Sequence, residues 1–223
     1  MLHQINKKIL IYIFFFIFLG TFNNKDLNKI KFFKLDDIKV IGLQDDENYQ
    51  LIKQLELFRL KNLYLLDKFE IKNILNSSNL IKDYSIFKRY PSTIEININP
   101  ANLLAKVQKN GKNFYFGSNG RLIDKKNNNE ELPFIFGEFR NKDFFDLYKI
   151  IKDTKFDYSE IKNLFFFNSG RWDIETKSGT IIKLPRDGLK ESFDLILRIL
   201  DKNDFDQIKI IDVRQKKQVI INE

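Results

Sequence analysis

Hydrophobic and polar residues alternate most regularly in the stretch 93–99. Ile94, Ile96 and Ile98 are separated by Glu95 and Asn97, and this period of two is typical of a β-strand that buries one face. One proline precedes the strand and another follows it. The stretch therefore predicts a structural strand rather than a catalytic motif.

The residues before that strand predict four more elements. Strand patterns cover 38–42 and 81–89, and apolar residues recur at helical spacing over 46–58 and 68–76. Asp67 lies directly before the second helix, where an acidic side chain caps exposed N–H groups. The order β-α-α-β-β predicts a two-layer α+β unit with both helices on one face of its sheet.

From residue 101 onward, short strand patterns are interrupted by two helical ones. Asn110-Gly111 separates the strand patterns 105–108 and 114–116, and both turn residues tolerate the positive φ angles of a tight hairpin. Helices are expected over 144–154 and 189–202, and further strands over 164–167, 171–174, 178–185, 210–214 and 218–222. The fold class is therefore α+β, ending in a mostly antiparallel β domain with two helices packed on the sheet.

An uncharged segment, residues 9–22, lies near the start of the chain. As a helix it is about 21 Å long, which is shorter than the ~30 Å hydrocarbon core of a bilayer. It fits a cleaved signal peptide or an uncleaved anchor extended by residues 2–6, with Lys7 and Lys8 reaching the headgroups. The anchor is favoured because residues 18–23 contain no small-residue cleavage pair. Its main apolar residues are Ile9, Phe14, Phe15, Phe16, Phe18 and Leu19.

Composition argues against most catalytic chemistries. The 223 residues include no cysteine and one histidine, His3, which precedes the apolar segment. A thiol nucleophile, a disulfide framework and a histidine-based triad in the folded region are thereby excluded. No glycine-rich phosphate loop occurs. We expect a protein that is not an enzyme and that has no cofactor, no catalytic or metal-binding residues and no small-molecule substrate.

The net charge of +8 is concentrated near the N-terminus. Residues 1–34 carry a net charge of +5, whereas the remaining 189 residues hold 32 basic and 29 acidic side chains. A groove that follows nucleic-acid phosphates needs a dense basic patch. We therefore expect no nucleic-acid partner.

Several motifs, taken in order, resemble a known family. The stretches IKVIGL, NLYLLDKFEI and IKDYSIFKRYPSTIEI resemble a POTRA domain. LPFIFG at 132–137, Arg171-Trp172 followed by the 178–185 strand, and IIDVR at 210–214 resemble the second domain of FtsQ/DivIB bacterial cell-division proteins. The resemblance covers essentially the whole chain.

The resemblance implies a domain organisation and a location. It implies a cytoplasmic tail at 1–8, a transmembrane anchor at 9–22, a linker at 23–33, a POTRA domain at 34–100 and an FtsQ-type β domain at 101–223. The protein is then a single-pass protein of the bacterial inner membrane. Its C-terminal domains lie in the periplasm, and it is enriched at the division septum.

The resemblance also implies a function. FtsQ-like proteins are scaffolds that link early and late division proteins, and an FtsB-like partner adds a strand to their C-terminal edge with an FtsL-like partner alongside. The POTRA domain is expected to bind other division proteins. The last strand ends the chain, so nothing encoded after it is expected to cover that edge. The matching partner-binding residues are Arg171, Arg214, Gln215, Lys217, Gln218, Val219 and Ile220.

Two residues and three other functions stay open at this point. Trp172 is either a core residue or an exposed binding anchor, and Arg214 either pairs with Asp212 or contacts a partner. The chain could instead be a POTRA-bearing docking component of another envelope assembly or transport machine. The other two alternatives are a secreted cell-wall enzyme with carboxylate catalysis and a cytoplasmic nucleic-acid protein.

Overall fold

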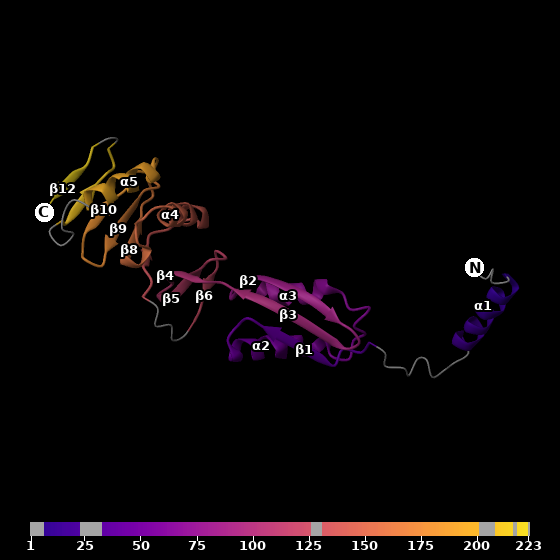
Figure 1. Cartoon of the computed structure of the whole chain (residues 1–223). Helices are drawn as coiled ribbons and strands as arrows, with labels where there is room; N and C mark the ends of the chain where they lie inside the picture. Colours follow the sequence, from indigo (N-terminus) through magenta and orange to yellow (C-terminus); the bar gives the residue numbers. More distant parts are fainter. Residues whose placement is uncertain (1–6, 23–32, 126–130, 201–207, 216–217, 223) are drawn as a thin grey trace. The chain divides into compact units, whose positions relative to one another are not determined.

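The computed structural model in Figure 1 describes residues 7–22, 33–125, 131–200, 208–215 and 218–222. Its contacts divide the chain into two compact units, Met1–Ser77 with Tyr84–Ile98, and Ser78–Asp83 with Asn99–Glu223. The expected tail and linker lie outside the described residues, apart from Lys7, Lys8 and Phe33.

Helix α1 (Lys7–Phe22) covers the uncharged N-terminal segment. Its side chains are exposed from Lys7 to Gly20. Among the described residues, no helix is at once long enough and apolar enough to cross a membrane. The anchor expected over 9–22 is not confirmed by this helix.

The first unit contains the expected β-α-α-β-β order. Its elements are β1 (Asp37–Ile41), α2 (Asp45–Leu55), the short 3₁₀ helix η2 (Glu56–Phe58), α3 (Lys68–Ser77), β2 (Ile81–Arg89) and β3 (Thr93–Pro100). The strand order is β1-β3-β2, and β1 runs parallel to β3. The carboxylate of Asp67 accepts the N–H of Phe69 at 2.9 Å, so the expected cap of α3 is confirmed.

One face of this small sheet forms the core of the first unit. Ile94, Ile96 and Ile98 are buried, and β1 adds Ile38 and Val40 to the same face through its register with β3. The apolar sides of both helices are buried as well, through Leu51, Leu55, Ile71 and Leu75. The helices therefore cover the isoleucine face, as the alternating pattern predicted.

The second unit contains a nine-stranded sheet in the order β12-β11-β10-β9-β8-β7-β4-β5-β6. Its first elements are β4 (Leu103–Lys109), β5 (Lys112–Gly117), β6 (Leu122–Ile123), β7 (Phe134–Phe136), α4 (Asn141–Asp153) and η3 (Tyr158–Glu160). They are followed by β8 (Ile161–Phe166), β9 (Trp172–Thr176), β10 (Ile181–Lys183), α5 (Leu189–Leu200), β11 (Ile210–Asp212) and β12 (Ile220–Asn222).

This sheet is more mixed than the expected, mostly antiparallel one. The β4·β7, β7·β8 and β10·β11 pairs are parallel, and the other five neighbouring pairs are antiparallel. A parallel pair needs a crossover connection, and α4 and α5 provide two of the three by joining β7 to β8 and β10 to β11. The helices pack on the sheet as expected, and they also set its strand directions.

Both helices cover the same face of the large sheet. Phe144, Leu147 and Ile151 of α4 and Phe193 and Ile196 of α5 are buried in one core. The same core includes an isoleucine or leucine from each of four strands, namely Leu164, Ile174, Ile182 and Ile211. These four residues occupy one row of the sheet register.

Candidate partner-docking edge

Strand β12 forms one edge of the large sheet. It pairs antiparallel with β11, with Ile211 opposite Ile221 and Asp212 opposite Ile220. No other described strand pairs with it. Ile220 and Ile221 are 55% and 43% exposed. An edge strand with exposed apolar side chains and unpaired backbone groups is a template for a strand from another chain.

The last strand is shorter than the expected 218–222. The N–H of Gln218 bonds to the carbonyl of Gln215 at 3.3 Å, so the chain is still turning there. Val219 packs against the core, and the ladder begins at Ile220. Lys217 lies outside the described residues.

Arg171 is positioned by the hairpin turn that joins β8 to β9. Gly170 adopts a φ of 79° in this turn, and the N–H of Phe167 bonds to the carbonyl of Arg171 at 3.0 Å. The guanidinium lies 5.2 Å from the centre of the Phe167 ring. Its Nε is buried and has no hydrogen-bond partner among the described residues.

Arg214 forms the local ion pair that the sequence left open. Its Nε lies 2.9 Å from Asp212 Oδ1, and its Nη2 lies 2.5 Å from Asp212 Oδ2. The side-chain hydrogen bond from Arg214 lowers the pKa of Asp212, and the same bond raises the pKa of Arg214. A guanidinium has five N–H donors, so this pair leaves donors that a carboxylate of another chain can use.

A buried acid lies in the same part of the sheet. The register places Asp173 opposite Lys183, and Lys183 opposite Asp212. Asp173 is only 8% exposed, and its Oδ1 has no hydrogen-bond partner among the described residues. Burial raises the pKa of Asp173, while Arg171, Arg214 and Lys183 act to lower it. Opposite charges therefore alternate across β9, β10 and β11.

Three arginines from distant parts of the sequence meet beside β12. Arg171, Arg186 and Arg214 line a hollow of about 340 Å³, here called the arginine pocket, together with Pro185, Asp212, Gln215 and Ile220. Four of the predicted partner-binding residues, Arg171, Arg214, Gln215 and Ile220, therefore lie together. Arg186 and Asp173 were missed, because no local pattern shows that the β10–α5 loop lines the same hollow as Arg214, or that β10 lies between β9 and β11 in the sheet.

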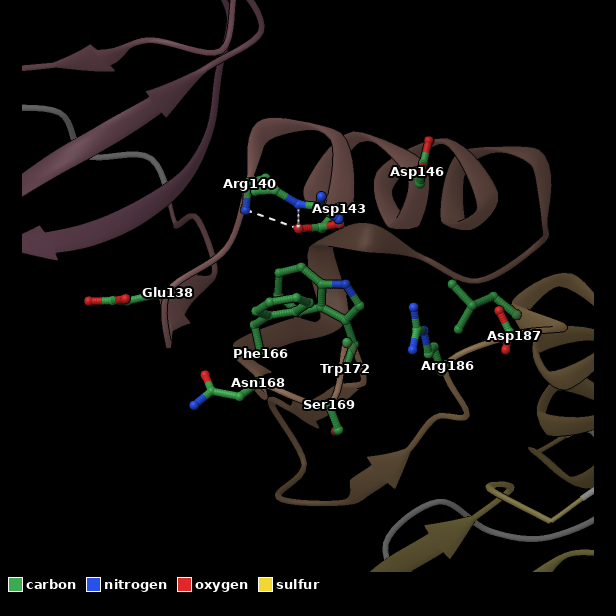
Figure 2. Close-up of a pocket in the computed structure, with 12 residues that line it drawn as sticks. Glu138, Arg140, Asp143, Asp146, Phe166, Asn168, Ser169, Trp172, Arg186 and Asp187 are labelled. Atoms are coloured by element: carbon green, nitrogen blue, oxygen red, sulfur yellow. Dashed lines mark hydrogen bonds and ion pairs between the residues drawn. The ribbon is translucent and has the colours of Figure 1, made fainter.

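Trp172 is a core residue rather than an exposed anchor. It is 3% exposed, and its ring centre lies 4.7 Å from that of Phe166. Figure 2 shows these two rings beside a second hollow, of about 580 Å³, whose lining includes acidic residues.

One acid of this second hollow is held by an arginine. Asp143 is bound to Arg140, whose side-chain hydrogen bond lowers the pKa of that carboxyl group. Glu138, Asp146 and Asp187 are spread around the hollow (Figure 2). A glycosidase needs one carboxyl group with a raised pKa to act as the acid, and Asp143 has the opposite shift. Within the described ranges, no group of three or more acidic, histidine or cysteine side chains could hold a metal ion.

The fold and the comparisons agree on the class of protein. Residues 33–99 match the family "POTRA domain, FtsQ-type", so the chain is a POTRA-bearing protein. Residues 105–214 match "Cell division protein FtsQ/DivIB, C-terminal". The chain belongs to the FtsQ/DivIB family of cell division proteins.

Curated relatives extend the match over most of the chain. "Cell division protein FtsQ" of Rickettsia bellii is 27% identical over 196 residues, covering 86% of this chain and 73% of that protein. The Rickettsia typhi protein of the same name is 26% identical over 204 residues, with the same coverage. A solved extracytoplasmic domain of DivIB from Geobacillus stearothermophilus is 13% identical, with a TM-score of 0.34 over 46% of this chain and 96% of that one.

Proposed function

We propose that this chain is a non-enzymatic scaffold of the bacterial division complex, linking early and late division proteins at the septum. Its C-terminal edge takes a strand from an FtsB-like partner, with an FtsL-like partner alongside. The observation that carries the proposal is the exposed strand β12 beside the arginine pocket. Membership of the FtsQ/DivIB family supports the role in division.

The exposed edge strand β12 and the arginine pocket together indicate which side chains a partner would carry. A strand added to β12 would form main-chain hydrogen bonds, and Ile220 and Ile221 would contact its apolar side chains. Arg214 has donors left after pairing with Asp212, and the Nε of Arg171 has no partner among the described residues. A carboxylate next to the added strand would meet the remaining donors of Arg214 in the arginine pocket, which Arg171 and Arg186 also line. The partner is therefore an apolar strand flanked by an acidic residue.

The proposal includes a membrane tether formed by residues 9–22. The uncharged, mostly apolar composition of residues 9–22 and the exposure of α1 as far as Gly20 support it. Residues 1–8 then lie in the cytoplasm, and the domains proposed at 34–100 and 101–223 lie in the periplasm. A reporter that is active only in the periplasm, fused after Glu223, tests this topology. An inactive fusion would contradict it.

The docking edge is tested by measuring capture of co-expressed FtsB-like and FtsL-like coiled-coil proteins. Removing one member of a buried charge pair costs about 2–5 kcal/mol, so Arg214→Glu should weaken binding by about thirtyfold or more. Lys142→Glu is the matched control, because it makes the same change in charge at an exposed position on α4. It should leave binding unchanged.

A second pair of variants tests the strand itself. Ile220→Lys places a charge on the edge strand and should reduce capture, whereas Ile41→Lys, at an isoleucine of similar exposure on β1, should not. Truncation after Val213 should abolish capture. Circular dichroism checks that each variant folds. Wild-type capture by folded Arg214→Glu and Ile220→Lys would show that the C-terminal site is wrong.

A further inference from the structure

Outside α1, the first unit carries most of its exposed apolar side chains at one end. Outside α1, its described residues include ten large apolar side chains that are exposed, and all but Ile41 and Tyr49 lie at the end where β1 and β3 begin. Six of them, here called the Tyr64 patch, are 39–77% exposed: Phe33, Leu60, Tyr64, Leu65, Phe69 and Tyr90. Exposed apolar groups concentrated in this way mark an interaction surface.

The loop that carries much of this patch is held firmly by hydrogen bonds. The N–H of Leu60 bonds to the carbonyl of Leu35 at 3.1 Å. The ammonium group of Lys88 bonds to the carbonyls of Tyr64 and Leu66, at 3.1 and 2.7 Å. Leu63 and Leu66 are buried, so the loop also contributes side chains to the core of the first unit. The hydrogen bonds and the buried leucines therefore hold Tyr64 and Leu65 in exposed positions.

Two patch residues adopt backbone conformations that non-glycine residues rarely take. Phe33 has a φ of 66° and Leu60 a φ of 74°. The left-handed region costs such residues about 1–2 kcal/mol. Phe33 also packs edge-on against Tyr90, with ring centres 5.6 Å apart. Strain that exposes apolar side chains needs a compensating interaction, and strained residues cluster at functional sites.

The chain enters the unit at this same end. Phe22 ends α1, and Phe33 is the first described residue of the folded unit. Ten intervening residues span at most about 33–36 Å. If α1 is the tether proposed above, the entry to the folded unit at Phe33 stays within about 33–36 Å of the end of the tether, and the Tyr64 patch is confined near the bilayer. Such confinement corresponds to a high effective concentration, at which weak contacts suffice.

The patch has the composition of a membrane-interface surface. Tyrosine favours the headgroup region, where its amphipathic ring has one apolar and one wet side, and phenylalanine inserts its ring below that level. Leucines bury their side chains below that level. Charged groups at this end are partly paired with each other, as in the Lys61–Glu70 and Arg89–Glu95 ion pairs. Apolar insertion, more than charge, would therefore hold the surface on lipid.

We propose that the Tyr64 patch docks the POTRA domain onto the outer surface of the membrane that holds α1. The occupant is a phospholipid surface, and the proposal depends on the tether of the preceding section. Docking would fix which end of the POTRA domain faces the bilayer. It would thereby leave the end with Ile41 directed away from lipid.

The absence of cysteine from the chain allows a single-label test on the full-length protein. Tyr64→Cys and Tyr49→Cys, at tyrosines 68% and 63% exposed, each receive an environment-sensitive fluorophore. The proteins are reconstituted in vesicles of phosphatidylcholine and phosphatidylglycerol at a ratio of about 3:1, which gives the anionic surface of a bacterial membrane. We expect a blue-shifted emission and quenching by headgroup-region quenchers at position 64 but not at position 49. Leu65→Asp in the Tyr64→Cys protein should remove both effects.

The outcomes separate this inference from the function on which it rests. Vesicle flotation of the chain with Leu65→Asp reports the tether without the patch, and a chain that does not float overturns both proposals. A chain that floats but shows equal emission at positions 64 and 49 overturns the docking only. The docking is also wrong if the label at position 64 becomes protected only after a protein partner is added. Capture through β12 is measured separately and does not depend on this result.

Discussion

Gly42 and Gly137 end strands β1 and β7 with a left-handed backbone. Their φ angles are 121° and 97°. A Cβ atom on Gly42 would lie 1.9 Å from the carbonyl oxygen of Ile98, and one on Gly137 would lie 2.1 Å from that of Phe166. Backbone of a neighbouring strand therefore occupies the space of any side chain. The glycines of the IKVIGL and LPFIFG motifs are required by close packing as well as by conformation.

At the residue scale, Gly42→Ala should lose more stability than a glycine substitution in open space. Gly179 is the control, because its φ is 92° and a Cβ atom added there would have no neighbour within 4 Å. Gly179→Ala should cost about 1–2 kcal/mol. Gly42→Ala adds a backbone clash, for which overpacking costs of about 1–3 kcal/mol are typical. Urea unfolding measures the loss of unfolding free energy in both variants. Equal losses would show that the backbone beside Gly42 moves away at no cost.

Helix α4 shows how a single carboxylate fixes an element boundary. Asp143 accepts the N–H of Arg140 at 3.1 Å, and its two oxygens take the guanidinium of Arg140 at 3.0 and 2.8 Å. This satisfies one N–H at the start of the helix and places negative charge in its first turn. Local chemistry therefore sets the start of α4 at Asn141, a few residues before the predicted boundary at residue 144.

At the element scale, Asp143→Ala should destabilise the second unit by about 1 kcal/mol at pH 7. The folded protein lowers the pKa of Asp143. Its contribution is therefore present above the unfolded value of ~3.9 and is lost as the pH falls through the lower, folded value. The difference from wild type should shrink as the pH falls through that range. At pH 7, Asp146→Ala, at an exposed acid one turn later, should cost much less, because it leaves the bonds between Asp143 and Arg140 in place.

Two cores divide the whole molecule. Ile96 lies at the centre of the small sheet and Ile174 at the centre of the large one, and both are fully buried. Neither unit is a single continuous stretch of the chain. Ser78–Asp83 belongs to the second unit, whereas Tyr84–Ile98 belongs to the first. Each core nevertheless contains its own helices and strands, which is the requirement for a unit that folds by itself.

At the scale of the molecule, Ile96→Ala and Ile174→Ala should act on different units. Each should lower the stability of its own unit by about 2–5 kcal/mol, because it leaves a cavity in a packed core. Hydrogen exchange of amides in β3 and β9 reports the two units separately. If Ile96→Ala speeds exchange in β9 as much as in β3, the two cores unfold as one.

Local patterns along the chain were enough to predict the elements and the family of this protein. Period-two and helical spacing located nearly every strand and helix, and Asn110-Gly111 forms its hairpin turn with φ angles of 51° and 75°. Each of these signals depends on residues only a few positions apart. The order of the motifs also indicated the resemblance to the FtsQ/DivIB family.

Which strands run parallel and which side chains meet could be seen only in the folded chain. The parallel pairs depend on where α4 and α5 pack, and no residue of β7 or β10 encodes that choice alone. Arg171, Arg186 and Arg214 come together because β9, β10 and β11 are neighbours in the sheet, and the Tyr64 patch exists because 33–35 pairs with 60–63. Such neighbours are set by burial of the whole core, a free energy that is shared over many residues and leaves no short-range pattern.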